Sequence, residues 1–154
     1  MSESGIDAGR GFVRDVMVAG RRWRARMDER LKGHGMTEAK FAALVWLARS
    51  PDGLSQSDVA ELAGIEPAAL VRTVDGLEAA GCVERRACPT DRRKNILHLT
   101  DHGRSMTAAL DKLAIELGRE VLGGLHPADL VIAARVLSHI RLRLDAVAGS
   151  PAQS

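Results

Sequence analysis

Two neighbouring stretches of the chain, residues 66–73 and 85–94, carry side chains that could read a nucleic-acid duplex. In the first, Arg72 follows Ala68 by four residues, so both lie on one face of a predicted helix. A face of small residues can approach a major groove closely, where arginine reaches a guanine edge or a phosphate and alanine reaches a thymine methyl. Alternatively, Arg72 is an ordinary surface residue. With the start of the preceding helix, the candidate contacts are Ser55, Gln56, Glu66, Pro67, Ala68, Ala69, Arg72 and Thr73.

The second stretch is the predicted tip of a β-hairpin, and it holds five basic residues against one acidic residue. Arg92 and Arg93 could enter the adjacent minor groove, where arginine reads groove width and negative potential. Asp91 would repel phosphates unless it has another role, so we expect it either to orient Arg93 through a bidentate ion pair or to cap the turn. The candidate contacts in this stretch are Arg86, Asp91, Arg92 and Arg93.

The formal net charge of +2 conceals how unevenly the charges are distributed, since 22 basic residues balance 20 acidic ones over the whole chain. Residues 10–32 hold eight basic residues against three acidic ones. Dense basic clusters in a nearly neutral chain favour a local anionic partner such as a phosphate backbone. A solvated turn could carry the same charges, so charge alone leaves both interpretations open.

Residues suited to enzymatic chemistry are scattered rather than clustered. The five histidines do not share a helix face, and neither a glycine-rich phosphate loop nor a zinc-protease motif is present. The two cysteines, Cys82 and Cys88, are too few for a disulfide scaffold or a four-ligand zinc site. We therefore predict no enzymatic activity, no cofactor and no metal site. We expect both thiols to be inert, with oxidation of Cys88 beside the basic cluster as the alternative.

The elements that position the two stretches can be read from caps and periodicity. Ser55-Gln56-Ser57-Asp58 has the form of a capping box, Gly64 ends the short helix that follows, and Pro67 suits the first turn of the next helix. Two short helices joined by a glycine turn are typical of a helix-turn-helix. Segments 82–86 and 95–99 then alternate as short strands. We predict a mainly α chain with a small β-wing, and a winged helix-turn-helix lobe over residues 36–100.

The flanking segments, residues 10–33 and 101–146, read as long amphipathic helices. Their apolar faces have no obvious domain to cover. We therefore expect these dimerisation helices to pack against a second copy of the chain, giving a homodimer; a compact monomer is the alternative.

Aromatic residues are few, and all four lie on apolar helix faces. That placement argues against single-strand binding, which uses exposed aromatic side chains. Trp23 and Phe41 belong either to the core or to a small-molecule pocket where the first helix crosses the DNA-binding lobe. An arginine of the first helix could pair there with a ligand carboxylate. The candidate ligand-binding residues are Arg14, Arg21, Trp23, Arg24, Met27 and Phe41.

The chain of 154 residues suits a single domain or a domain with a helical appendage. Its longest apolar run, residues 41–48, has eight residues, whereas a membrane span needs roughly 20. The first 20 residues carry too many charges for the apolar core of a signal peptide. We therefore expect a cytoplasmic protein without a membrane partner.

Three stretches of this sequence resemble the MarR family of winged-helix regulators, and most closely its SlyA-like branch. Residues 64–81 are similar to the recognition helix of that branch. The segment from Asp91 to Gly103 fits the family's wing pattern D-x-R-x5-L-T-x-x-G at every position. Trp23-Arg24, with Asp28 and residues 30–32, resembles its first helix. The resemblance extends over roughly residues 12–145, so the whole chain reads as a single MarR-type unit.

The resemblance implies a homodimeric transcriptional regulator, often a repressor, that binds a pseudo-palindromic duplex. It also implies release from DNA by a small anionic aromatic, such as a phenolic carboxylate. Carried over to this chain, Arg72 and its neighbours would read the major groove, Arg93 would enter the minor groove, and Asp91 would orient Arg93. A ligand-independent or counter-silencing architectural regulator is the alternative.

Two departures from the family pattern bear on these expectations. The branch usually has Pro then Ser before its Leu-Val-Arg stretch, whereas here Pro67 comes one position earlier and Ala69 replaces the serine. A serine contact to DNA is therefore absent, and operator preference should differ. The peroxide-sensing members carry a reactive cysteine in the first helix, and this chain has none there.

Overall fold

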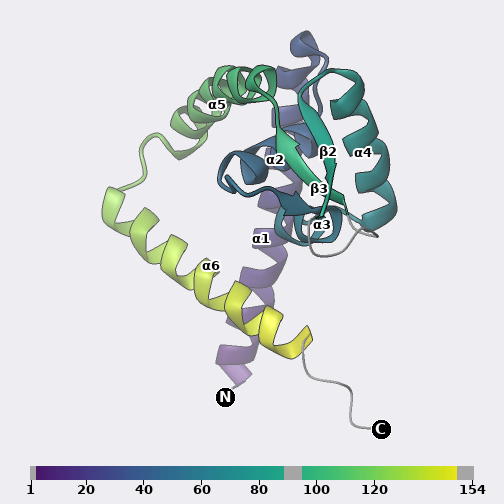
Figure 1. Ribbon diagram of the computed structural model, residues 1–154. Coiled ribbons are helices and arrows are strands. Elements are labelled where there is room, and N and C mark those ends of the chain that lie inside the picture. The colour runs from purple at the N-terminus through teal and green to yellow at the C-terminus, as the bar shows by residue number, and fades with distance from the viewer. Residues whose placement is uncertain (1–2, 89–94, 149–154) are drawn as a thin grey trace, which may run out of the picture. The chain divides into compact units, whose positions relative to one another are not determined.

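The structure is a computed structural model that describes residues 3–88 and 95–148. In chain order, the helices are α1 (Glu3–Leu31), α2 (Glu38–Ala48), α3 (Gln56–Ala63), α4 (Pro67–Ala79), α5 (Asp101–Leu122) and α6 (Pro127–Ala148), with a 3-10 turn at Lys32–His34. The strands are β1 (Leu54–Ser55), β2 (Val83–Ala87) and β3 (Asn95–Leu99). The chain divides into two compact units, Met1–Leu117 and Gly118–Ser154. The mainly α class with a small winged sheet is confirmed (Figure 1).

The antiparallel sheet has the strand order β1-β3-β2, with Val83 opposite Leu99 and Leu54 opposite Leu97. The hairpin of β2 and β3 was predicted, but β1 was not, because two residues are too short to show an alternating pattern. Gly53 makes this third strand possible. Its φ of 77° is left-handed, and a Cβ there would lie 2.6 Å from the Leu97 carbonyl oxygen.

The helix-turn-helix begins and ends as its caps predict. The Ser55 side chain accepts the Asp58 amide proton, and the Asp58 side chain accepts from the Ser55 amide, which completes the capping box at the start of α3. Gly64 ends α3 with a φ of 63°, and Pro67 opens α4. Short connections therefore set the angle between the two helices.

The core of the first unit forms around α4, whose Leu70, Val74 and Leu77 are fully buried. They join Leu44 of α2, Val59 of α3, Leu97 of β3, Leu110 of α5, and Met27 and Leu31 of α1 in one cluster. Only the last part of α1 contributes to this cluster. The expected start of α1 near residue 10 is wrong: the helix begins at Glu3, and no proline interrupts residues 3–10.

The apolar faces left open lie at the ends of the chain. Exposed apolar residues on α1 are Phe12, Val13, Val16 and Met17. In the second unit, α6 exposes Val131, Ile132, Val136, Leu137, Leu142, Leu144 and Val147. Among the described residues, no single helix is both long and apolar enough to cross a membrane.

Thr100 closes the hairpin at the start of α5. Its amide donates to the Cys82 carbonyl at 3.1 Å, and its hydroxyl donates to the Gly81 carbonyl at 2.7 Å. The same hydroxyl accepts the Gly103 amide at 2.9 Å. A Cβ on Gly103 would lie 2.0 Å from the Cys82 carbonyl oxygen. The L-T-x-x-G pattern thus has a physical cause. The threonine joins the two ends of the hairpin, and the glycine lets α5 approach the backbone at Cys82.

We expect Gly103→Ala to lower the free energy of unfolding by about 2 kcal/mol or more, because the methyl group meets backbone that cannot move aside cheaply. Chemical denaturation measures this loss. Gly118→Ala is the matched control on the same helix, since nothing lies within 4 Å of the added methyl. That variant should gain up to about 1 kcal/mol from helix propensity. Equal effects of the two substitutions would contradict the close approach at Gly103.

A hydrogen bond from the Glu38 backbone amide to the Asp28 carboxylate joins α2 to α1. The Glu38 amide donates to Asp28 Oδ1 at 2.6 Å, so Asp28 of α1 caps the start of α2. The Glu38 side chain is half-buried, and this burial raises the pKa of its carboxyl group. Arg24 opposes the shift, and the negative charge of Asp28 adds to it. The folded state therefore binds the Glu38 proton more tightly than the unfolded chain does.

Because this carboxyl pKa is raised on folding, the stability contributed at Glu38 should fall as pH rises through the raised value. We expect Glu38→Gln to increase the Tm at pH 7.5 and to change it little at pH 4, where the wild-type group is protonated. Calorimetry of both proteins at the two pH values measures the difference. A gain that is equal at both pH values, or larger at pH 4, would contradict the assignment.

Candidate nucleic-acid interface

The exposed face of α4 is built from small side chains and one arginine. Glu66, Pro67, Ala68 and Arg72 are exposed, while Ala69 and Thr73 are half-buried. No hydrogen bond or ion pair joins Arg72 to any residue that the structure describes, so its guanidinium is available to a ligand. The opposite face is the buried stripe of Leu70, Val74 and Leu77. Core packing on one side of α4 thus presents the other side to solvent.

Several predicted contact residues use their polar atoms within the protein. The Glu66 carboxylate caps α4 by accepting the Ala69 amide at 3.0 Å. The Thr73 hydroxyl donates to the Ala69 carbonyl at 3.0 Å, and the Ser55 hydroxyl lies 2.6 Å from Asp58 Oδ2. These three side chains stabilise the helices, whereas the Arg72 donors make no such bond to the described part of the chain.

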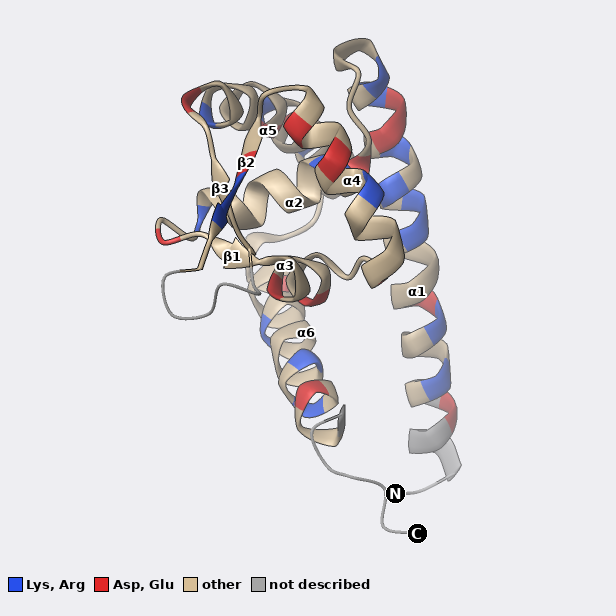
Figure 2. Cartoon of the chain, turned by 45° about the vertical axis from the view of Figure 1, so that its right-hand side comes forward, with Lys and Arg blue, Asp and Glu red and all other residues tan. Residues whose placement is uncertain are grey.

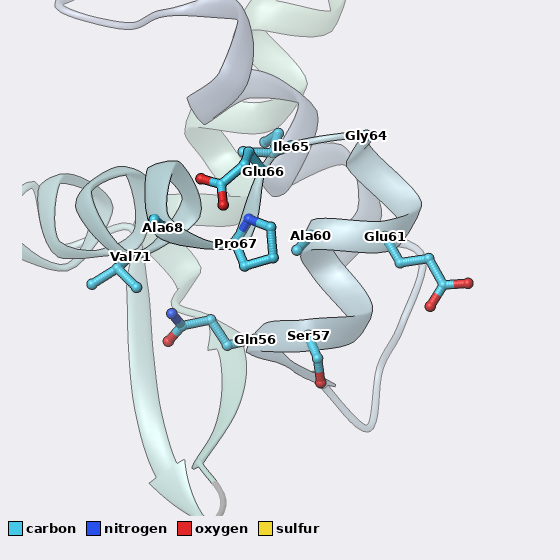
Figure 3. Close-up of a pocket in the computed structure, with 10 residues that line it drawn as sticks. All are labelled: Gln56, Ser57, Ala60, Glu61, Gly64, Ile65, Glu66, Pro67, Ala68 and Val71. Atoms are coloured by element: carbon cyan, nitrogen blue, oxygen red, sulfur yellow. The ribbon is translucent and has the colours of Figure 1, made fainter. Parts of the chain in front are cut away.

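A concavity of about 720 Å³ lies between α3 and α4 (Figure 3). Gln56 and Ser57 from the start of α3 lie near Pro67, Ala68 and Val71 of α4, and Glu61 points away from them. Sequence reasoning missed Val71, whose side chain is 44% exposed. The signal was present, because Leu70, Val74 and Leu77 already complete the inner stripe and leave Val71 as an apolar residue outside it. The predicted residues Gln56, Pro67 and Ala68 therefore share one surface with a residue that was not predicted.

Strand β2, whose basic residues are blue in Figure 2, contacts α4. Its two arginines make different contacts. Arg86 is exposed and pairs with Glu84 of its own strand. Arg85, which was not among the predicted contacts, donates to Asp75 and Glu78 of α4. Asp91, Arg92 and Arg93 lie outside the described residues, so their predicted roles at the tip stay predictions.

The predicted ligand-binding residues divide into exposed arginines and core residues. Arg14, Arg21 and Arg24 are exposed on α1, and Trp23 is partly buried against the core. Met27 is 1% exposed and Phe41 is 8% exposed, so both are members of the core. Neither lines the concavity between α3 and α4 nor a smaller one of about 240 Å³ between α2 and α5. The pocket stays a prediction.

The described residues hold no group of three or more His, Cys, Asp or Glu side chains that could bind a metal ion. Cys82 is buried, and this burial raises the pKa of its thiol, with the positive charge of Lys40 opposing the shift. A thiol with a raised pKa is a poor nucleophile. Neither a metal group among the described residues nor a reactive Cys82 thiol therefore supports covalent or metal chemistry at this face.

Comparison with known proteins finds a matching family. The model of the MarR family matches residues 34–94, from the turn before α2 to the segment before β3. The solved structure of the transcriptional regulator PA3341 is 32% identical, with a TM-score of 0.78, over 88% of this chain and 98% of that chain.

Two further structures share the fold at lower identity. AbsC, a MarR family transcriptional regulator from Streptomyces coelicolor, is 24% identical with a TM-score of 0.75, over 95% of this chain and 97% of that one. The transcriptional regulator SlyA is 19% identical with a TM-score of 0.77, over 86% of this chain and 93% of that one.

We expect Arg72→Ala to weaken binding to a specific duplex about tenfold, because one arginine contact to a base or phosphate is lost. Fluorescence anisotropy at several salt concentrations measures the loss. A guanine contact would also relax discrimination at one base pair, whereas a phosphate contact would reduce the salt slope by about 1. Arg26→Ala is the matched control, since Arg26 pairs on the surface with Glu29 of α1. Undiminished affinity of Arg72→Ala would remove Arg72 from the interface.

Proposed function

The chain belongs to the MarR family of transcriptional regulators, and from this premise we propose that it is a repressor that binds a pseudo-palindromic operator as a homodimer. We further propose that a small anionic aromatic ligand releases it from DNA, and that it acts in the cytoplasm. Regulators of this family bind DNA and act as dimers, and the family is one of regulators rather than enzymes. We propose beyond this that the chain represses transcription, that its operator is pseudo-palindromic and that an effector releases it.

The exposed face of α4 is the observation that carries the proposal. Ala68 and Pro67 present little bulk at the start of the helix, and Arg72 follows one turn later with its guanidinium free of the hydrogen bonds described above. A narrow helix face of this kind fits the width of a major groove, and the basic strand β2 suits the neighbouring backbone. We infer that α4 reads bases while the β2–β3 hairpin contacts the flanking phosphates and minor groove.

The open apolar faces support a second copy as the partner. The Phe12, Val13, Val16 and Met17 side chains of α1 are between 39% and 69% exposed, and those of α6 extend along its whole length. Large exposed apolar patches on a protein commonly mark an interface, so these faces favour a second copy of the chain as the partner. In a twofold dimer, two α4 helices would read half-sites about 34–36 Å apart, one helical turn of DNA. This spacing would restrict binding to operators with matching symmetry.

Effector release requires only that the ligand favours a dimer with the wrong spacing. Arg14, Arg21 and Arg24 are the predicted partners of a ligand carboxylate, with Trp23 as the neighbouring aromatic surface. Because Met27 and Phe41 are buried in the core, we infer that a second copy completes the pocket around Trp23. A 100-fold loss of operator affinity needs about 2.7 kcal/mol of coupling between the two sites.

The test is a fluorescence-anisotropy titration of the purified protein with the intergenic DNA beside its own gene, with and without salicylate. We expect tight, salt-dependent binding that exceeds binding to random DNA, and weaker binding when salicylate is present. Sedimentation in the same buffer should give the mass of a dimer. Tight binding that ignores salicylate would favour the ligand-independent regulator. A monomer, or binding without sequence preference, would contradict the operator model.

Arg24→Ala separates the effector site from the DNA-binding face. We expect this variant to bind the operator with wild-type affinity and to lose release by salicylate, because the carboxylate loses its charged partner. Arg26→Ala, on another face of α1, is the matched control and should be released normally. Normal release of Arg24→Ala would exclude Arg24 from the effector site.

A further inference from the structure

One guanidinium connects the strand that leads into the wing to the helix that faces DNA. Arg85 of β2 donates from its Nη2 atom to Asp75 Oδ1 at 2.6 Å and from its Nη1 atom to Glu78 Oε2. Both carboxylates belong to α4. The Arg85 side chain is 22% exposed, whereas those of Asp75 and Glu78 are 58% and 38% exposed. Arg85 is therefore the better buried member of a three-residue ion cluster that spans two elements.

The position of Arg85 in the sheet allows this cluster to fix the hairpin relative to α4. Arg85 lies opposite Leu97, in the middle of the five residue pairs that join β2 to β3. Leu97 is fully buried, so this point of the hairpin is anchored to the core. The tip, residues 88–94, follows three residues later. The ion pairs of Arg85 thus add a link to α4 at the middle of the paired part of the hairpin.

The neighbouring Arg86 makes no comparable connection. Its guanidinium pairs with Glu84 of the same strand, and its side chain is 62% exposed. The two adjacent arginines carry the same charge, yet the described contacts link only Arg85 to α4. Arg86 is therefore available to serve as a matched control that removes one positive charge at nearly the same place.

Asp75 and Glu78 would lower the affinity for DNA, so their presence on α4 calls for a structural role. Asp75 and Glu78 bring two negative charges to the helix that is proposed to enter the major groove (Figure 2). Phosphates repel such charges over distances of about 10 Å at moderate salt. Ion pairing with Arg85 offsets this repulsion. Because the Arg85 guanidinium is already paired with two carboxylates, it is a poor candidate for a phosphate contact.

We propose that Arg85 is a positioning residue that sets the angle between α4 and the β2–β3 hairpin, so that helix and wing engage adjacent grooves together. This inference rests on the proposed duplex binding. Guanidinium suits the task because its planar donors can bind two carboxylates in fixed directions, whereas an ammonium group is a point charge. The three side chains act on the geometry of the contact surface and do not themselves touch DNA.

The decisive variant is Asp75→Asn/Glu78→Gln, because two explanations predict opposite signs. If the carboxylates only repel phosphates, removing both negative charges tightens binding to every duplex. If they hold Arg85, operator affinity falls about tenfold while binding to random DNA tightens, so that discrimination is lost. Glu61→Gln on the adjacent helix α3 is the control, and it should slightly tighten binding to the operator and to random DNA. Tighter operator binding by the double variant would overturn the proposal.

Arg85→Met and Arg86→Met give an independent measure through the salt dependence of operator binding. Arg86→Met should reduce the salt slope by about 1, as expected for one lost phosphate contact. Arg85→Met should reduce it by more than 1, because a displaced wing withdraws several cations at once. Arg85→Lys should restore the salt slope only in part. A reduction of 1 or less for Arg85→Met, or full rescue by lysine, would count against positioning.

Hydrogen exchange of the DNA-free protein distinguishes failure of this inference from failure of the proposed function. Amides of residues 83–87 and 95–99 should exchange faster in Asp75→Asn/Glu78→Gln than in wild type or Glu61→Gln, at a temperature well below the Tm. Unchanged exchange would overturn this link to α4 whether or not the protein binds DNA. Faster exchange in a protein that shows no preference for any duplex would contradict the proposed function and, with it, the role of Arg85 in DNA recognition.

Discussion

The amphipathic packing of α4 is the constraint on which the rest of the structure depends. Leu70, Val74 and Leu77 are fully buried, and each of α1, α2, α3, α5 and β3 supplies a side chain to the cluster around them. This burial fixes the rotation of α4 about its axis. Consequently Ala68 and Arg72 must face outward, and no separate interaction is needed to present them. The stability of the lobe and the direction of the face proposed to bind DNA have the same physical origin.

Much of the fold could be predicted because its signals are local. The capping box at Ser55, Gly64 at the end of α3 and Pro67 at the start of α4 each specify a helix end within a few residues. Periodicity of the apolar residues then identified the inner stripe of α4. The family assignment rested on a wing motif and a helix motif together, and it is confirmed.

The features that sequence reasoning missed depend on partners distant in the chain. Strand β1 exists because Gly53 allows a close approach to β3, more than 40 residues later. The role of Arg85 could not be read from a cluster of basic residues, since only the fold brings Asp75 and Glu78 within reach. For the same reason Arg85 and Arg86 look equivalent in sequence and differ in structure. Predictions for Asp91, Arg92 and Arg93 concern residues outside the described part of the chain.

The bonds made by Thr100 have a consequence for how this chain can change. Its amide and hydroxyl join the residue after β3 to the two residues before β2, so the two ends of the hairpin are held together at its base. A segment pinned in this way at its base behaves as an interchangeable module. Insertions, deletions and altered charge at its tip need not disturb α4 or α5. If the proposed DNA-binding role holds, mutation can therefore alter flanking-sequence preference in the wing while the framework of α3 and α4 stays constant.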